Sequence, residues 1–250
     1  MDLLPIPDVP ALSAKGTKDW VCVADLHIGI EVQLRRAGFN IPSQAVKMLA
    51  AIKGLASHGE HLLILGDVKH RIPAVSYKED REIPPFLNGL LESYDSITVV
   101  AGNHDGGLGA ILPSGVKAVP GGGLLIEGFG AIHGHVWPSK DAMKGDALVM
   151  GHIHPSMLLV DSLGGKSNEK CWVRARLSKE KAAERYESCP DKLIVVPAFN
   201  PLITGTPINK ATGMTLGPVF RNQLVDPSSV RAYLLDGTDL GAPTQIPRAD

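Results

Sequence analysis

The sequence predicts an α/β fold, in which helices pack against the face of a β-sheet. Over the first hundred residues, short apolar runs of strand length alternate with segments whose apolar residues recur at helical spacing. From about residue 116 the pattern changes, and short strands punctuated by glycine predominate. An alternating first half and a strand-rich second half therefore define the predicted class.

In the first half, each predicted strand is an apolar run that ends in polar residues. These strands are expected at residues 19–27, 61–67 and 96–105. A helix is predicted over residues 45–59, ending near Gly59, which is suited to a C-cap. A second helix is predicted over residues 83–94, with its prolines in the first turn, where proline is tolerated.

The second half is predicted to consist mainly of strands. They are expected within residues 116–135, 146–161, 170–178 and 192–209, with weaker strand signals at 217–220 and 230–235. A short charged helix is predicted over residues 178–187, with Ser178 as its N-cap. Because the chain contains no internal repeat, low-complexity tract or long linker, residues 1–250 are expected to form a single domain.

The composition is that of a soluble globular protein, with 44% hydrophobic and 20% charged residues. The net charge of −1 gives no global basic field for nucleic acid, although it does not exclude a local basic patch. The three cysteines are widely spaced, which argues against a disulfide framework or a thiolate zinc site. The sequence shows no signal peptide and no apolar run of the roughly 20 residues that a membrane helix needs. We therefore expect a cytoplasmic protein with no membrane partner.

Five polar clusters follow apolar runs, and each contains side chains that bind metals. Carboxylate and amide oxygens combined with imidazole suit Mn²⁺, Fe²⁺ or Zn²⁺. Ligands gather at strand ends in open sheets, so five such ends imply one shared site. About seven ligands exceed what a single ion takes, so two ions are expected. The clusters are Asp25-Leu26-His27, Gly66-Asp67, Gly102-Asn103-His104-Asp105, His133-Gly134-His135 and Gly151-His152-Ile153-His154.

Each cluster taken alone also has a purely structural explanation. Gly-Asp is usually a turn, and Asp-Leu-His is a common tripeptide. The segment 151–154 is more informative, because two buried imidazoles one residue apart need polar partners. In a half-buried strand, His152 and His154 would share one face and Ile153 the other. The joint occurrence of the clusters in this order favours a shared metal site.

The series DLH, GD, GNHD, H and GHIH, spanning residues 25–154, resembles the signature of the calcineurin-like metallophosphoesterases. The resemblance implies a hydrolase with a four-layer αββα sandwich, in which two mixed β-sheets are flanked by helices and a two-metal site lies at the strand ends. It also implies a division of the ligands. One ion would be held by Asp25, His27, Asp67 and His154, and the second by Asp67 as a bridge together with Asn103, His133 and His152.

The resemblance assigns catalytic roles to the residues after Asn103. His104 would not be a ligand; it would lie over the substrate as a proton donor or charge stabiliser, and Asp105 would orient its imidazole. His133 is preferred to His135 as the ligand, because the family's ligand is usually the first histidine of an HGH turn. Two cations would clamp the phosphate and activate a water for in-line attack on phosphorus. Manganese is the expected metal, with iron, zinc, nickel and cobalt as alternatives.

Basic residues near the second motif suggest a phosphate-binding rim. Lys69 and Arg71, which flank His70, and Arg35 and Arg36, which follow the first motif, are the candidates; their alternative interpretation is solvated surface charge. His70 stands where some family members carry a tyrosine that binds ferric iron, so a phenolate-bound ferric centre is not expected. Three roles stay open for His70: approaching a metal, contacting phosphate or capping the loop.

The segments GDVKH and VVPAFNPLITG resemble a narrower subgroup, the ICC-like phosphoesterases, whose bacterial relatives include ligase-associated DNA damage response endonucleases. This resemblance implies a phosphodiesterase or nuclease acting on DNA or RNA. The alternatives are a phosphatase or cyclic-nucleotide phosphodiesterase, and a non-catalytic scaffold, which the presence of every expected ligand disfavours. Residues 172–185 are the best local basic segment, and residues 163–190 suit a substrate-side flap, the contact of a homodimer or plain scaffold.

Overall fold

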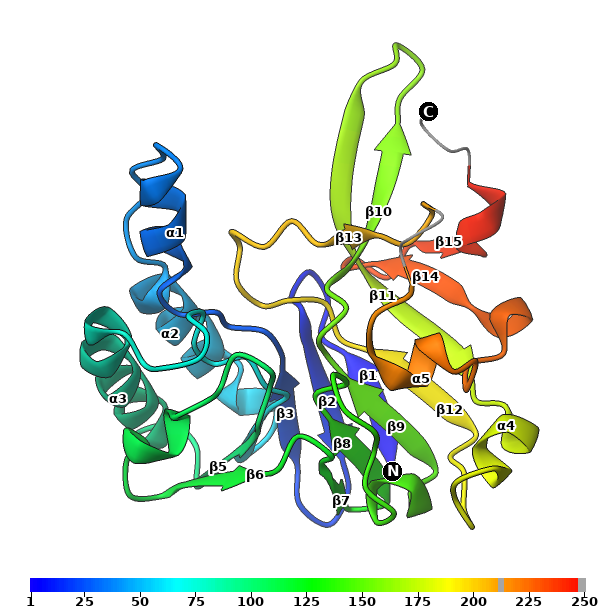
Figure 1. Cartoon of the computed structure of the whole chain (residues 1–250), viewed down its shortest axis with the longest axis horizontal. Helices are drawn as coiled ribbons and strands as arrows, with labels where there is room; N and C mark the ends of the chain where they lie inside the picture. Colours follow the sequence, from blue (N-terminus) through cyan, green and yellow to red (C-terminus); the bar gives the residue numbers. More distant parts are fainter. Residues whose placement is uncertain (211–213, 247–250) are drawn as a thin grey trace.

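The computed structural model describes residues 1–210 and 214–246. Two mixed β-sheets pack face to face, and helices cover the outer face of each sheet (Figure 1). This arrangement confirms the predicted two-sheet sandwich with flanking helices. None of the described helices is long and apolar enough to cross a membrane.

The first sheet carries the larger helices. Its strands β3 to β6 run parallel, and β1 and β2 add an antiparallel edge. In spatial order they are β1 (Asp2–Pro5), β2 (Ala11–Lys15), β3 (Trp20–Val23), β4 (His61–Ile64), β5 (Ser96–Val100) and β6 (Val116–Val119). The accompanying helices are α1 (Ile30–Arg36), α2 (Ala45–Gly54) and α3 (Tyr77–Leu91).

The second sheet is mixed and carries two short helices, α4 (Lys179–Ala183) and α5 (Gly217–Arg221). In spatial order its main strands are β13 (Thr206–Pro207), β10 (Pro155–Val160), β11 (Lys166–Arg176), β12 (Lys192–Val195), β9 (Ala147–Met150), β8 (Phe129–Ile132) and β7 (Leu124–Ile126). Two further strands, β14 (Arg231–Leu234) and β15 (Asp239–Gly241), pair beside β11. Single 3₁₀ turns occur at Ala56–His58, Leu108–Ala110, Ala142–Lys144, Pro227–Ser229 and Pro243–Gln245.

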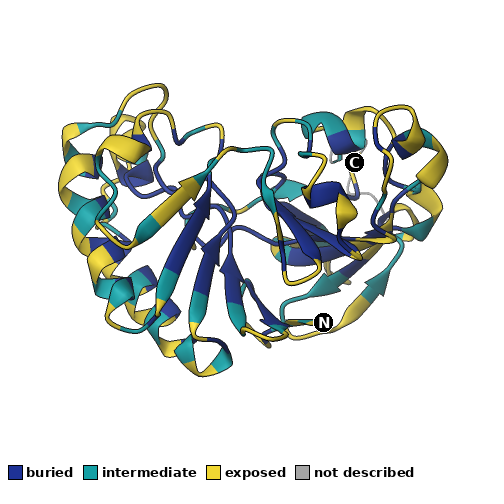
Figure 2. Cartoon of the chain, turned by 90° about the horizontal axis from the view of Figure 1, so that it is seen from below, coloured by how far each residue is buried: buried dark blue, intermediate teal, exposed yellow. Residues whose placement is uncertain are grey.

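Alternation along the central strands separates the layers. Val21 and Val23 of β3 face the core beneath α2 and α3, whereas Cys22 faces the core between the two sheets. The neighbouring strand β4 alternates in the same way, with Leu63 on the inner face. Because side chains of successive strand residues point to opposite faces, a strand buried on both sides reads as a continuous apolar run. Figure 2 shows these strands buried between exposed helical surfaces.

Most predicted elements are confirmed with shorter bounds, but α3 differs. It begins at Tyr77 rather than after the prolines, and Pro84 and Pro85 lie inside it. Ser76 and Glu79 form a reciprocal capping box, so the sequence S-x-x-E marked the true start. Capping and the buried apolar face of the helix outweigh the two hydrogen bonds that the prolines remove.

Three further differences concern short elements. Residues 217–220, read as a weak strand, belong to the helix α5, whose first turn contains Pro218. The strands β1 and β2 were not predicted, because prolines and aspartate interrupt the N-terminal pattern. The segment 163–190 contains β11, the second strand of a β10–β11 hairpin whose tip protrudes from the body of the molecule (Figure 1). It also contains α4, whose predicted N-cap Ser178 is confirmed.

Candidate metal centre

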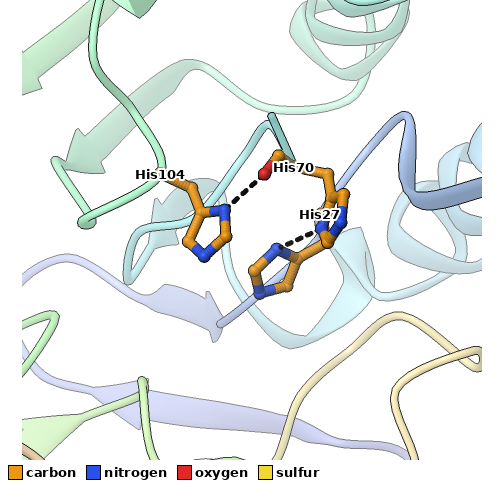
Figure 3. A group of neighbouring side chains, drawn as sticks. All are labelled: His27, His70 and His104. Carbon is orange, nitrogen blue, oxygen red and sulfur yellow. Dashed lines mark hydrogen bonds between the residues drawn. The ribbon is translucent and has the colours of Figure 1, made fainter. Parts of the chain in front are cut away.

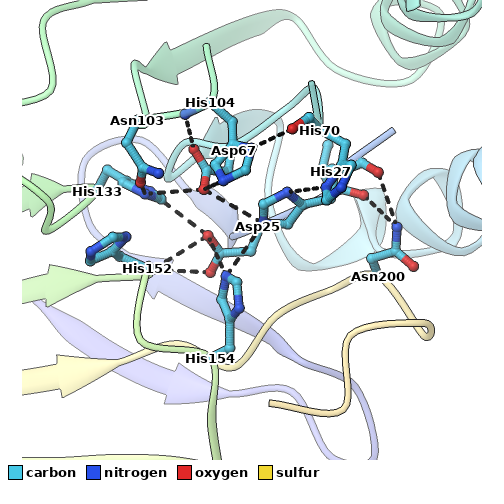
Figure 4. Close-up of polar contacts among 12 residues, drawn as sticks. Asp25, His27, Asp67, His70, Asn103, His104, His133, His152, His154 and Asn200 are labelled. Carbon is cyan, nitrogen blue, oxygen red and sulfur yellow. Dashed lines mark hydrogen bonds and ion pairs between the residues drawn. The ribbon is translucent and has the colours of Figure 1, made fainter. Parts of the chain in front are cut away.

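The predicted ligands converge from the ends of five strands in both sheets (Figure 4). Residues after β3, β4 and β5 approach from the first sheet, and residues after β8 and β9 approach from the second. Parallel strands place their carboxyl ends at one edge, which is why segments far apart in the chain meet here. The convergent side chains are Asp25, His27, Asp67, Asn103, His104, His133, His152 and His154.

Among the described residues, three groups of donor atoms are close enough to hold an ion: His27, His70 and His104 form one, and the other two share Asp67. Of these two, one contains Asp25, His27, Asp67 and His154, and the other contains Asp67, His133 and His152; within each group all donor atoms lie within 4.8 Å of one another. The Asp67 Oδ2 is 3.5 Å from the Nε2 of both His27 and His133.

The amide of Asn103 extends the second group. Its Oδ1 lies 3.1 Å from the His133 Nε2. The second group contains His133 and not His135, in agreement with the preferred choice. Asp25, His27 and His154 thus lie on one side of Asp67, and Asn103, His133 and His152 on the other; their division between two ions stays a prediction.

The backbone at this centre is strained. Asp25, His27, Asp67, His152 and His154 all have positive φ, between 41° and 70°. Such conformations cost of order 1–3 kcal/mol each for residues other than glycine and persist only where the surroundings over-determine them. Residues in this state at one point of the fold indicate a functional site.

Crowding explains the glycines that precede the ligands. A Cβ on Gly102 would lie 2.1 Å from the Asp67 Oδ1, and a Cβ on Gly66 would lie 2.3 Å from the His133 Nδ1. Glycine is therefore required because the loops after β4, β5 and β8 approach each other closely, not only because the chain turns.

In the segment 151–154, the two histidines lie on the opposite side from Ile153, as predicted, but the cause differs from the one expected. Ile153 is buried in the core on the outer side of the second sheet, while His152 and His154 face the metal centre, as predicted. The segment is not a strand, however. His152 and His154 have φ of 70° and 49°, so a tight left-handed bend, rather than strand alternation, separates the histidines from the isoleucine.

Two buried carboxylates dominate the electrostatics. Asp25 and Asp67 are almost fully inaccessible to solvent. Burial opposes their ionisation, but the neighbouring histidines His154 and His133 hold the pKa of both carboxyl groups below the ordinary value. Burial by itself would lower the pKa of His133, but its hydrogen bond to Asp67 and the charges of both aspartates raise it to about 9. Buried anions that recruit a proton onto an imidazole provide an environment suited to cations.

Two other imidazoles at the centre are neutral, whereas for His154 the charge of Asp25 overcomes burial and raises the pKa. Burial lowers the pKa of His27 to about 3, and burial together with the charge on His133 lowers the pKa of His152 to about 4. A neutral imidazole has a lone pair for a metal. His133 donates from Nδ1 to the Leu65 carbonyl oxygen at 2.7 Å, so its Nε2 is the nitrogen that faces Asn103 and Asp67. Hydrogen bonding of this kind is typical of metal-binding histidines.

His70 contacts His27 from outside the centre (Figure 3). The His70 Nε2 lies 2.6 Å from the Gln33 Oε1, which can only accept, so Nε2 carries the hydrogen. Burial and the charge of His104 lower the pKa of His70, which leaves its Nδ1 free to accept from the His27 Nδ1 at 3.3 Å. The His27 Nε2 then presents its lone pair to Asp67 and His154. His70 thus orients His27, a role outside the three that the sequence left open.

His104 lies at the open side of the centre, with about a fifth of its side chain exposed. Its backbone N–H donates to the Asp67 Oδ1 at 2.8 Å, and its ring Nδ1 contacts the His70 carbonyl oxygen. The prediction that Asp105 orients this ring is wrong. The Asp105 carboxylate instead accepts from the backbone N–H groups of Gly102 and Lys69, at 2.8 and 3.3 Å, and so shapes the turn that carries His104.

The predicted phosphate rim needs two corrections. Lys69 is fully buried and its Nζ donates to the Arg71 carbonyl oxygen, so it supports the loop and does not reach the surface. Of the two predicted arginines of α1, Arg36 lines the groove that opens beside His104 and Arg35 does not. Arg71 and His70 do line this groove, which has a volume of about 800 Å³.

Two structural residues were missed by the sequence analysis. The buried Asn200 donates to the Leu26 carbonyl oxygen at 2.7 Å and so ties the 195–205 segment to the loop that carries Asp25 and His27. Glu79 accepts from the backbone N–H groups of His70 and Arg71, at 3.0 and 2.6 Å. The capping sequence at residues 76–79 gave a signal for Glu79. Asn200 lies in the segment VVPAFNPLITG that carries the narrower resemblance, but its contact with Leu26 depends on tertiary structure.

The chain belongs to the calcineurin-like phosphoesterase family, whose model matches residues 21–174, more than half of its length. With this family and a His/Asp centre of two ligand groups, the protein is a metal-dependent phosphoesterase. No curated protein matches the chain.

Of two similar solved structures, the first has a TM-score high enough to show the same fold. The nuclease MPE of Pseudomonas putida is 19% identical, with a TM-score of 0.55 over 96% of this chain and 100% of that chain. The phosphoesterase YfcE of E. coli is 17% identical, with a TM-score of 0.40 over 89% of this chain and 96% of that chain.

Proposed function

We propose that this metallophosphoesterase uses two divalent ions, of which manganese is the first candidate, to hydrolyse phosphodiester bonds of nucleic acid. One observation carries the proposal: two groups of metal-binding side chains share a single buried carboxylate, Asp67. A shared carboxylate is what a bridged pair of cations requires.

The donor set fits this pair of ions. Asp25, His27 and His154 would complete one site, and Asn103, His133 and His152 the other, with Asp67 between them. Imidazole with carboxylate and amide oxygen suits manganese, iron or zinc. When bound, two such ions polarise the phosphate oxygens and activate the attacking water.

The residues around the ions would hold protons at defined atoms. His70 keeps the hydrogen of His27 on Nδ1, and Leu65 keeps that of His133 on Nδ1, so both Nε2 atoms face inward. His104, whose Nδ1 is held by the His70 carbonyl oxygen, would donate a proton from Nε2 to the departing oxygen. No nucleophilic side chain is needed, because water is the attacking group.

Features of the adjacent groove support nucleic acid over smaller substrates. The groove opens beside His104 and is lined by Arg36, Arg71 and Lys78 without any carboxylate. At about 800 Å³ it is larger than a simple phosphomonoester would need. One solved structure with this fold is a nuclease, which agrees with the proposed substrate class.

A substrate panel tests the proposal directly. The Mn²⁺-loaded protein would be assayed with single-stranded and duplex DNA, RNA, cyclic nucleotides and phosphomonoesters, and the Asp67→Asn variant would show which activity originates at the metal centre. We expect nucleic acid to give the highest kcat/KM. A higher kcat/KM for phosphomonoesters or cyclic nucleotides would replace this proposal with the small-molecule alternative.

A further inference from the structure

The groove beside His104 has two walls that are far apart in the chain. Helix α1 contributes one wall, including Val32 and Arg36, and the loop from residue 70 into the start of α3 contributes the other. His70 and His104 both line it, so the groove is continuous with the metal centre. A molecule in this groove would therefore be attached to the phosphate on the side that His104 faces.

The charge on the groove is entirely of one sign. Three cations and no carboxylate line it. Lys78 is balanced by Glu31 and Glu82, at 3.3 and 3.7 Å. In contrast, the guanidinium groups of Arg36 and Arg71 form no ion pair within residues 1–210 and 214–246. Two uncompensated guanidinium groups beside a phosphoesterase centre match a substrate with a further phosphate.

The groove also exposes apolar side chains, which a phosphate would not need. Val32, Ile72 and Tyr77 line it with 36%, 53% and 76% of their surfaces exposed. Arg81 donates to the Tyr77 hydroxyl at 2.7 Å, and its guanidinium carbon lies 5.6 Å from the ring centroid. An anchored aromatic ring beside unpaired cations is the combination that binds a nucleobase together with its backbone.

Buried carboxylates fix the two walls before any substrate binds. Glu31 of α1 contacts Lys78 of α3, which joins the walls, and its other oxygen accepts from the Gln44 backbone N–H at 2.7 Å. Glu79 accepts from the backbone of both His70 and Arg71 and from that of Ser76 at 2.6 Å. The groove is thus a preformed feature of the fold, which lowers the cost of ordering it on binding.

We propose that this groove binds the nucleotide on the leaving-group side of the scissile phosphate, in a single-stranded nucleic acid. Tyr77, with Val32 and Ile72, contacts the base, and Arg36 and Arg71 contact the next phosphate. A single strand is required because a duplex hides the faces of its bases by stacking. The inference rests on the proposed function, since it assigns part of the same substrate.

Paired variants test the groove. Arg36→Ala is compared with Arg35→Ala, which removes the adjacent exposed arginine that does not line the groove, and Tyr77→Ala is compared with Phe39→Ala, another exposed aromatic residue. For the Mn²⁺-loaded protein, kcat/KM is measured on a single-stranded oligodeoxynucleotide, on its duplex and on bis-p-nitrophenyl phosphate. The last substrate reports the condition of the metal centre in every variant.

For each variant we take the kcat/KM on the single-stranded oligonucleotide divided by the kcat/KM on bis-p-nitrophenyl phosphate. This ratio should fall about 10-fold in Tyr77→Ala and Arg36→Ala, mainly through KM, and should stay near the wild-type value in the control variants Phe39→Ala and Arg35→Ala. Arg36→Ala should also reduce the slope of log(kcat/KM) against log[salt] by about 0.7. The groove assignment would be overturned if each groove variant gave the same ratio as its control, or if the wild-type protein hydrolysed the duplex faster than the single strand. Either result would leave the proposed function intact. A wild-type protein that hydrolyses only bis-p-nitrophenyl phosphate would overturn the nucleic-acid proposal itself.

Discussion

The metal centre and the groove beside it are built in opposite ways. The centre is buried, its carboxylates and imidazoles contact one another, and five strand ends from both sheets hold it in a strained backbone. The groove is exposed, two of its cations have no ionic partner in the described chain, and one short helix and one loop form its walls. The comparison indicates that the centre serves chemistry that tolerates little change, whereas the groove is free to determine which substrate reaches it.

The largest effect is expected at the residue that both ligand groups share. Asp67→Asn removes the charge between two cation sites, so occupancy of both should fall and turnover should drop by at least about 10³-fold, because metal stabilisation of the transition state is worth several kcal/mol. Metal analysis and turnover of bis-p-nitrophenyl phosphate measure this, with the exposed Asp95→Asn as the matched control. Full occupancy of both sites in Asp67→Asn would show that Asp67 is not a bridge.

His104 should affect turnover without affecting the ions. His104→Ala is expected to reduce kcat on the order of 10²–10³-fold, within the range for loss of a general acid, while both manganese ions stay bound. The control is His58→Ala, a half-buried histidine in the 3₁₀ turn before β4, at the opposite end of that strand from Asp67. Turnover equal to that of the control would remove His104 from the chemistry, and loss of metal would make it a ligand.

Proton release should accompany metal binding at the centre. Burial lowers the pKa of His133, but its hydrogen bond to Asp67 and the aspartate charges raise it to about 9. His133 must lose this proton to bind an ion, so the apparent affinity for manganese should fall about tenfold per pH unit below 9. In the metal-free protein, the stability contributed by this raised pKa is full below pH 6.5 and is lost as pH rises through about 9. Calorimetry in buffers of different ionisation enthalpy measures the protons released; a value near zero at pH 7 contradicts the assignment.

The smallest effect is expected at the junction between the two regions. Gln33 lines the groove, and its side-chain oxygen holds the hydrogen of His70 on Nε2. The free Nδ1 of His70 in turn orients His27. Gln33→Leu should weaken manganese affinity by up to about 10-fold, as for other residues that orient metal-binding histidines, and Gln33→Glu, which keeps an acceptor, should not. Equal manganese affinities in Gln33→Leu and Gln33→Glu would show that Gln33 does not influence the metal centre through His70 and His27.

The sequence predicted the centre better than its surroundings. Asp25, Asp67 and the histidines after β8 and β9 follow apolar runs in a recognisable order, so motif and strand pattern together located them. Asn200 and the role of His70 were missed, because both act through contacts between segments far apart in the chain. Lys69 was wrongly assigned to the phosphate-binding rim. A charged residue in a loop after a strand is expected to be exposed, and the burial of Lys69 depends on how that loop packs.

The same limit applies to the fold. The apolar runs of β3, β4 and β5 predicted three strands of a sheet with helices on its face, whereas β1 and β2 at the sheet edge, with prolines around them, gave no clear pattern. Helix α5 was read as a strand, because a five-residue segment is too short to show helical periodicity. Edge and short elements depend on the neighbours they pack against.

Anomalous diffraction from crystals grown with manganese tests the central claim most directly. Two cations sharing Asp67 should give two manganese peaks about 3.5–4 Å apart, with the Asp67 carboxylate between them. A single peak, or two peaks in separate parts of the molecule, would contradict the account.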